Sequence, residues 1–223
     1  INYLNKGYKY VEGWFSRSSL MAIYRLSNFQ HELSITGSLI EIGVHHGRSS
    51  ILLNLCTKEN EIAVAYDLFK IQDQNEEQSG SGDKKIFIEN LKKHHCDLDK
   101  TRIIQNNSLE LTADKIINDA VEKSRIFIID GGHTYDVVSN DLTLASEVAC
   151  EGGIIIVDDY FDSGFPAVSE ATINFINQND SLIPFLIIDE KVFFTNSKKY
   201  AQQYYEYIDN FQPDYIINRR KLF

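Results

Sequence analysis

The sequence predicts an α/β fold: a mostly parallel sheet of seven strands with helices on both faces and an antiparallel hairpin at its C-terminal end. Apolar runs rich in β-branched residues alternate with helical stretches, which is typical of βαβ units. Only residues 189–191 separate the last two apolar runs, a link too short for a parallel crossover, so these runs predict a hairpin. A length of 223 residues fits one domain.

The first half of the chain predicts two strand-helix units after an N-terminal helix. We expect a helix at 18–29, a strand at 39–43, a helix at 48–56 and a strand at 62–67. The stretch 84–94 is amphipathic, with Ile86, Ile88 and Leu91 near one face, and leads to a weaker strand at 102–105. Segment 71–83 has no apolar periodicity, and it follows the carboxyl end of the second strand. We therefore interpret it as a loop that can act as a lid.

The second half completes the sheet. We expect a strand at 125–130, a helix at 135–148, a strand at 154–157, a helix at 168–177 and closing strands at 182–188 and 192–195. The run at 154–157 is apolar on both faces, which is typical of a central strand.

Composition and charge exclude several classes of partner. No apolar run approaches the roughly 20 residues that cross a bilayer. A formal charge of −10, without a basic stripe, argues against a nucleic-acid partner. Cys56, Cys96 and Cys150 are scattered, without CxxC spacing, and this suits a cytoplasmic location.

Two features at predicted strand ends indicate an adenosine-bearing ligand. Gly43 and Gly47 follow the first strand, where glycine lets the backbone turn tightly and approach a ligand. Their spacing differs from the GxGxxG of dinucleotide sites, which favours another nucleoside cofactor. Asp67 ends the second strand, where a carboxylate can accept hydrogen bonds from ribose hydroxyls.

Three carboxylates at neighbouring strand ends predict a metal site. Asp130 follows the fourth strand, and Asp158 and Asp159 follow the fifth. Like charges that converge in a cleft repel one another, so a hard divalent cation, Mg²⁺, is the natural partner. The alternative, that Asp158 or Asp159 caps the next helix or turn, accounts for one of them but poorly for all three. His133 lies on the same loop as Asp130 and can take a proton near neutral pH.

These motifs resemble the class I S-adenosylmethionine-dependent methyltransferases, in the branch of small-molecule O-methyltransferases that carry a DxxH loop. The resemblance covers about residues 13–195 and rests on 41–49, on 130–135 with Asp141, and on 152–160. It implies a cofactor site made of Glu41, Gly43, His45, Gly47 and Ser49 around methionine, Asp67 at ribose, Asn107 or Ser108 near adenine, and Asp130 beside them. By similarity to metal-dependent catechol-type and macrolide-sugar enzymes, Asp130, Asp158 and Asp159 would bind Mg²⁺.

The resemblance also implies a mechanism and an organisation. The metal would lower the pKa of an acceptor hydroxyl, and His133, with Asp130, would carry catalysis as the general base. Catechol-type enzymes use a lysine there, so His133 suggests a less acidic acceptor such as a sugar hydroxyl. The expected acceptor is a sugar, a nucleotide sugar or a phenol. We expect an N-terminal helical cap at 1–36, an S-adenosylmethionine-binding core at 37–196 and a helical tail at 197–223. The tail is expected to shape the acceptor pocket or form a homodimer contact.

Two alternatives come from other classes. The first is an NAD-dependent oxidoreductase on a similar sheet, which the glycine spacing and the terminal hairpin disfavour. The second is a catalytically idle S-adenosylmethionine-binding module, because a fold alone does not guarantee activity. The three carboxylates and His133 weigh against the second.

Overall fold

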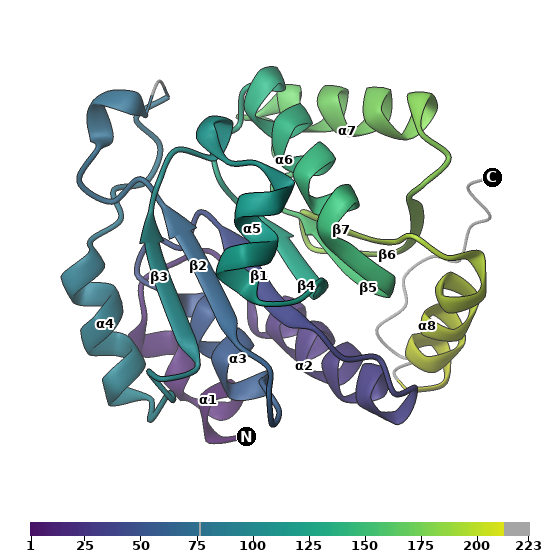
Figure 1. Cartoon of the computed structure of the whole chain (residues 1–223), viewed down its shortest axis with the longest axis horizontal. Helices are drawn as coiled ribbons and strands as arrows, with labels where there is room; N and C mark the ends of the chain where they lie inside the picture. The colour runs from purple at the N-terminus through teal and green to yellow at the C-terminus, as the bar shows by residue number, and fades with distance from the viewer. Residues whose placement is uncertain (76, 212–223) are drawn as a thin grey trace.

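The computed structural model describes residues 1–75 and 77–211 and contains a seven-stranded mixed sheet (Figure 1). The strand order is β3-β2-β1-β4-β5-β7-β6. The strands are β1 (Ser38–Ile42), β2 (Ala63–Asp67), β3 (Thr101–Gln105), β4 (Ser124–Ile129), β5 (Ala149–Val157), β6 (Ile183–Ile188) and β7 (Lys191–Thr195). The predicted fold class is confirmed.

Strands β1 to β5 pair in parallel, and β7 runs antiparallel to both β5 and β6. Only residues 189 and 190 join β6 to β7, so the chain has no room for a crossover and turns back as a hairpin. Because β1, β2, β4 and β5 share one direction, their carboxyl ends meet at one edge of the sheet, where open α/β sheets place their ligands.

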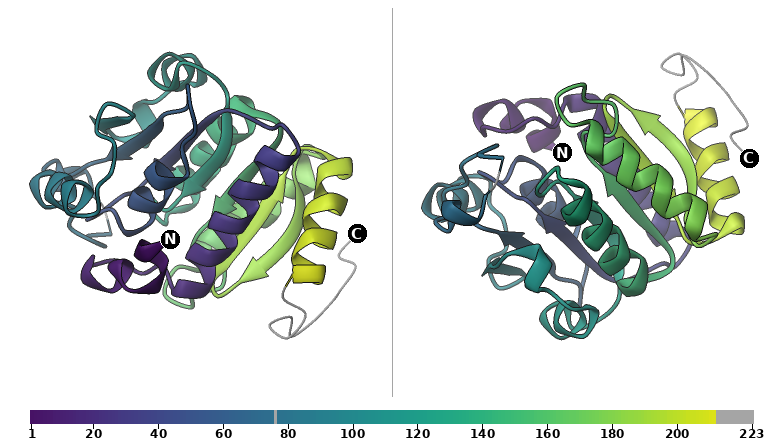
Figure 2. Two further views of the ribbon diagram at one scale, coloured as in Figure 1. Left: turned by 90° about the horizontal axis from the view of Figure 1, so that it is seen from below. Right: turned by 90° about the horizontal axis from the view of Figure 1, so that it is seen from above.

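Helices cover both faces of the sheet (Figure 2). One face is covered by α1 (Asn2–Asn5), α2 (Arg17–Glu32), α3 (Arg48–Cys56), α4 (Lys84–Lys93) and α8 (Lys198–Phe211), and the other by α5 (Ala113–Ala120), α6 (Tyr135–Val148) and α7 (Pro166–Gln178). Successive strand residues point to opposite faces. Leu39 and Ile128 therefore pack in the first core, whereas Ile40 and Phe127 pack in the second.

Five short elements of the described chain have no counterpart in the sequence prediction: α1, α5 and the 3₁₀ helices Gly7–Tyr10, Gln72–Gln74 and Ser108–Glu110. The fifth strand also begins earlier than predicted, at Ala149 rather than residue 154, because α6 passes directly into β5. Gly152 has φ +77° within this strand, and the pairing of β4 with β5 shifts register between Ser124 and Ile126. The first residues of β5 are irregular and include glycine, so they do not form the apolar run by which a strand is predicted from sequence.

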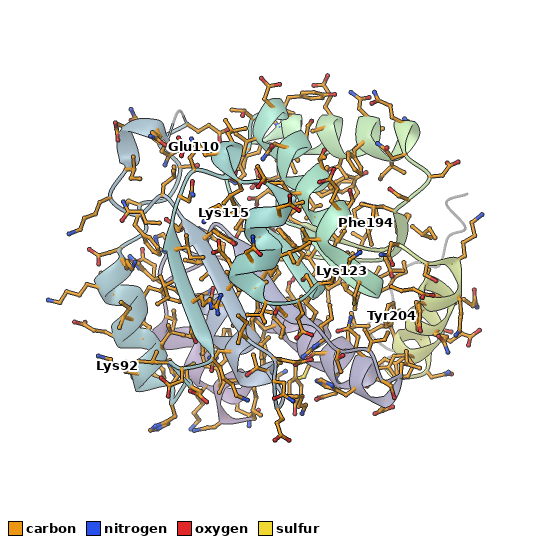
Figure 3. All side chains as sticks on the ribbon, viewed as in Figure 1. Lys92, Glu110, Lys115, Lys123, Phe194 and Tyr204 are labelled. Atoms are coloured by element: carbon orange, nitrogen blue, oxygen red, sulfur yellow. The ribbon has the colours of Figure 1, made fainter. Side chains whose placement is uncertain are left out.

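Surfaces and chain ends complete the description. Lys92 lies exposed at the C-terminal end of α4, where a cation complements the helix dipole (Figure 3). Across the described residues, no helix is both long and apolar enough to cross a membrane. The predicted tail begins as α8, and its residues 212–223, including the basic segment 218–221, lie outside the described residues.

Candidate active site at the carboxyl edge of the sheet

The turn after β1 contacts the loop after β4 through Gly43. Its φ is +84°, and its N–H donates to the carbonyl oxygen of Tyr66 on β2 at 2.8 Å. A Cβ at this position would lie 1.8 Å from the carbonyl oxygen of Asp130. Glycine is therefore required here, because any side chain would force the ends of β1 and β4 apart.

Gly47 ends the same turn and opens helix α3. Its φ is +91°, and its N–H donates to the carbonyl oxygen of Val44 at 2.7 Å. A Cβ here would lie 2.3 Å from the ring of Phe87 on α4. Both predicted glycines thus occupy positions that combine a left-handed backbone with close packing.

Glu41, on β1, is fully buried beneath the turn. The hydroxyls of Ser49 and Ser50, at the start of α3, donate to its two carboxylate oxygens. Burial raises the pKa of Glu41 to about 7, although the two serine hydrogen bonds oppose that shift. The structure brings the predicted residues Glu41 and Ser49 together and adds Ser50.

Asp67, at the end of β2, is bound to the glycine turn. Its Oδ2 accepts the N–H groups of Val44 and His45, each at 2.9 Å, and its Oδ1 accepts the N–H of Phe69 at 2.6 Å. The structure thus places two predicted residues, Asp67 and His45, side by side. A ribose at this site would share the carboxylate with three backbone donors.

Asn107 and Ser108 follow β3 and point to different neighbours. The Asn107 side chain caps the short 3₁₀ helix Ser108–Glu110, and its Nδ2 donates to Gln74 Oε1 at 3.1 Å. Ser108 is buried, and its carbonyl oxygen accepts the side-chain N–H of Asn140 on α6 at 3.0 Å. Asn107 therefore borders the loop 71–83, whereas Ser108 packs against α6.

The loops after β4 and β5 bring together two of the three predicted metal carboxylates. Ligand atoms of Asp130, His133 and Asp159 all lie within 4.8 Å of one another. His133 Nε2 is 2.9 Å from Asp159 Oδ2. Among the described residues, Asp158 belongs to no such group; its Oδ1 instead lies 2.6 Å from the Nζ of Lys191.

The electrostatics of this cluster call for a positive charge. Burial raises the pKa of Asp130 well above its ordinary value, and the charges of Asp158 and Asp159 raise it further. Burial lowers the pKa of His133, but the hydrogen bond and charge of Asp159 and the charge of Glu77 outweigh burial, so the net shift is upward. The cluster therefore favours protons or another cation.

The donor set fits a divalent cation held by Asp130 and Asp159. Mg²⁺ prefers oxygen ligands alone, whereas an imidazole beside carboxylates also suits Mn²⁺, Fe²⁺ or Zn²⁺. The ring of His133 stacks on Phe165, with ring centroids 3.8 Å apart and an interplanar angle of 13°. This stacking holds the imidazole in one plane next to the carboxylates.

Residues 77–83 of the predicted lid lie along the same edge. Glu77 Oε2 accepts the backbone N–H of His133 at 2.6 Å and is 3.1 Å from its Nδ1. A Cβ on Gly82 would lie 2.8 Å from Asp67 Oδ1. The loop thus passes both halves of the site.

Sequence reasoning missed Glu77 and Lys191. The sequence contains no signal for Glu77, because it lies in a loop without periodicity. Lys191 could have been identified by aligning the first closing residues of the hairpin with the fifth strand. In the antiparallel pairing, Val157 lies opposite Val192, so the residue before Val192 is next to Asp158.

This strand order, with a glycine turn after β1 and acidic loops after β4 and β5, defines a class I methyltransferase fold. A family model described as a methyltransferase domain matches residues 40–160, more than half of the chain. The chain therefore belongs to this methyltransferase family, as the sequence motifs predicted. No curated protein matches the chain.

Solved structures support the same fold. The O-methyltransferase NovP superposes with a TM-score of 0.67 at 16% identity, covering 80% of this chain and 79% of NovP. CalS11, a TDP-rhamnose 3'-O-methyltransferase of calicheamicin biosynthesis, gives 0.62 at 13%, covering 87% and 85%. A Bacillus cereus O-methyltransferase in complex with S-adenosylhomocysteine (SAH) gives 0.61 at 12%, covering 87% and 91%. At these identities the likeness establishes the fold.

Proposed function

We propose that this chain transfers the methyl group of S-adenosylmethionine to a hydroxyl oxygen of a small molecule, with His133 as the general base. One observation carries the proposal: the Gly43 turn touches the backbone of Asp130, so a donor above the turn lies beside His133 and the carboxylates. The likeness to O-methyltransferases supports the choice of oxygen, and the complex with SAH supports the donor.

In this proposal the donor occupies the glycine turn. Gly43 and Gly47 give the turn the left-handed backbone that places it beside the methionine part, and the buried Glu41, held by Ser49, lies beneath the turn as the partner of the ammonium group. His45 and Asp130 border the pocket, Asp67 accepts from ribose, and Asn107 or Ser108 faces adenine. We assign residues 37–196 to this core and residues 1–36 to a cap over it, and helix α8 of the tail packs against β6 and β7.

The chemistry requires alignment and a proton acceptor. A divalent cation on Asp130 and Asp159 would supply the positive charge that lowers the pKa of the acceptor hydroxyl. His133 Nε2 takes the hydroxyl proton. The oxygen then forms its bond to the methyl carbon as the carbon–sulfur bond breaks, leaving SAH. Phe165 and Glu77 hold the imidazole plane and backbone, which fixes Nε2 beside Asp159 at the carboxylate cluster.

The acceptor we favour is a sugar or nucleotide sugar, with a phenol as the alternative. An imidazole base and a cation together suit an alcohol of high pKa, and one similar structure is a TDP-rhamnose 3'-O-methyltransferase. Membership of the methyltransferase family argues against the NAD-dependent alternative.

A cofactor-consumption screen tests this proposal. Sugars, nucleotide sugars and phenols are incubated with S-adenosylmethionine and the protein, once with Mg²⁺ or Mn²⁺ and once with chelator, and SAH is quantified. We expect acceptor-dependent SAH with at least one hydroxyl compound and a lower rate in chelator. A protein that binds SAH but turns over none of these acceptors would favour an idle binding module. Equal rates with metal and with chelator would remove the metal from the mechanism.

A further inference from the structure

We propose that Lys191 is a built-in counter-ion that holds Asp158 out of metal coordination, so that a divalent cation at this site is bound by Asp130 and Asp159 without Asp158. This inference rests on the proposed metal-assisted function. It assigns a different role to Asp158 than to Asp130 and Asp159, although the sequence analysis predicts all three as metal ligands.

The ion pair between Lys191 and Asp158 is closed to solvent. The Nζ of Lys191 lies 2.6 Å from Asp158 Oδ1, and the two side chains are 4% and 3% exposed. The same ammonium lies 4.3 Å from the ring centroid of Phe15, a cation–π contact with a buried aromatic side chain. Because both side chains are buried, solvent and salt screen their attraction much less than at the surface.

The backbone around Lys191 keeps the ammonium in place. Lys191 begins β7, and the register that sets Val157 opposite Val192 aligns it with Asp158. The preceding turn is tied to the start of α2, because Ser16 donates to Asp189 Oδ2 at 2.5 Å and Ser19 donates to the same oxygen. The lysine backbone is thus anchored on both sides, and a metal that reached Asp158 would have to displace a fixed ammonium.

The arrangement of charges explains why one carboxylate needs its own partner. Glu41, Asp130, Asp158 and Asp159 all face this small region, and the loop adds Glu77 beside His133. One divalent cation cannot offset all of them, and a buried carboxylate without a partner is costly. Lys191 neutralises Asp158, and the group within ligand distance is then Asp130, His133 and Asp159.

Binding of Mn²⁺ alone, followed by the electron paramagnetic resonance of the free ion, tests this proposal without any turnover. We expect Asp159→Asn to weaken Mn²⁺ binding by about tenfold or more. Asp158→Asn leaves the ammonium of Lys191 unpaired near the cation, so it should also weaken binding, but only by about threefold. Lys191→Met frees a buried carboxylate and should tighten binding by about tenfold or more. Glu147→Gln, an exposed site on α6, is the control for the loss of one negative charge.

Because each single change leaves one buried charge unpaired, the double variant Asp158→Asn with Lys191→Met provides the check on folding. It removes both charges together and should bind Mn²⁺ like the wild type. Weakening in the double variant, to the level of Asp159→Asn, would make Asp158 a ligand and overturn the proposal, as would a folded Lys191→Met with unchanged affinity. If the wild type binds no Mn²⁺, the metal has no place in the proposed function. In that case, Mn²⁺ binding gained by Lys191→Met would still support the counter-ion role. A Lys191→Met variant that also bound no Mn²⁺ would overturn the counter-ion role.

Discussion

At the scale of single residues, the site depends on contacts that leave no room for a side chain. Gly43 joins the two halves of the site, since its N–H reaches Tyr66 on β2 and its Cα lies against the backbone of Asp130. A sequence search identifies this glycine by its place after a strand, but the partner it approaches becomes visible only in the folded sheet.

Gly43→Ala should therefore be strongly destabilising. The new Cβ would meet a carbonyl oxygen at 1.8 Å on a backbone with φ +84°, so the strands must shift. We expect a loss of about 3 kcal/mol or more in the free energy of unfolding, measured by urea denaturation. Gly80→Ala is the matched control. It also has positive φ, +60°, but its nearest neighbour atom is 3.9 Å away, so it should cost only about 1–2 kcal/mol. Equal losses in the two variants would contradict the close-contact argument.

The buried Glu41 should make stability depend on pH. Its pKa is raised from 4.5 to about 7, so the folded state favours the protonated form. The resulting stabilisation is complete below about pH 4.5 and is lost as the pH rises through 7, which at about 1.4 kcal/mol per pKa unit amounts to roughly 3 kcal/mol. Glu41→Gln keeps a group for the serine hydroxyls but does not titrate. The stability of wild type minus variant, measured from pH 4 to 8, should fall across this window; a flat difference would contradict the shift.

At the scale of elements, the sequence predicts the strands and most helices well because their apolar periodicity is strong. The helices at 48–56 and 135–148 begin and end as predicted. The misses have physical reasons. Helix α5 has only eight residues, and the first half of β5 is irregular, with Gly152 at positive φ. Parallel order also brings Asp130 and Asp159 to one edge, as predicted, whereas the pairing of Asp158 depends on the antiparallel register of β7.

A buried ion pair connects several elements below the site. Arg125, on β4, binds Glu61 through two hydrogen bonds of 2.8 and 2.9 Å, and the side chains are 0% and 2% exposed. The same guanidinium donates to Gln30 and Ser27 on α2 and to the carbonyl oxygen of Cys56 on α3. This network ties β4 to α2 and α3.

Glu61→Gln should consequently cost about 3–5 kcal/mol, because it leaves the guanidinium buried without its counter-charge. Glu89→Gln is the matched control, since Glu89 pairs with Lys85 at 3.9 Å in an exposed contact on one helix. That loss should stay below about 0.5 kcal/mol. The free energy of unfolding of both variants is measured by thermal and denaturant unfolding. If Glu61→Gln cost no more than the control, the pair would have no role in joining these elements.

At the scale of the whole molecule, the apolar cores on the two faces of the sheet differ from the edge where the carboxyl ends of the strands form the candidate site. Two apolar cores fill the two faces, while buried polar side chains such as Glu41 and Asp158 lie at or just below the carboxyl ends of the strands. The order of strands is enough to predict that these side chains meet. Which of them pair with one another is decided by loops and by the C-terminal hairpin, where the sequence has weak signals.

In the proposed reaction, His133 removes a proton from a hydroxyl beside a donor bound at the Gly43 turn. Its most direct test supplies S-adenosylmethionine labelled with ¹³C in the methyl group, together with an acceptor found in the screen. Product formation is followed by NMR, and affinity for SAH by calorimetry, in wild type and His133→Ala. We predict an O-methyl signal from the wild type, a loss of about 100-fold or more in its rate of appearance in the variant, and unchanged affinity for SAH. Label on an atom other than oxygen, or equal losses of rate and affinity in the variant, would contradict this reaction.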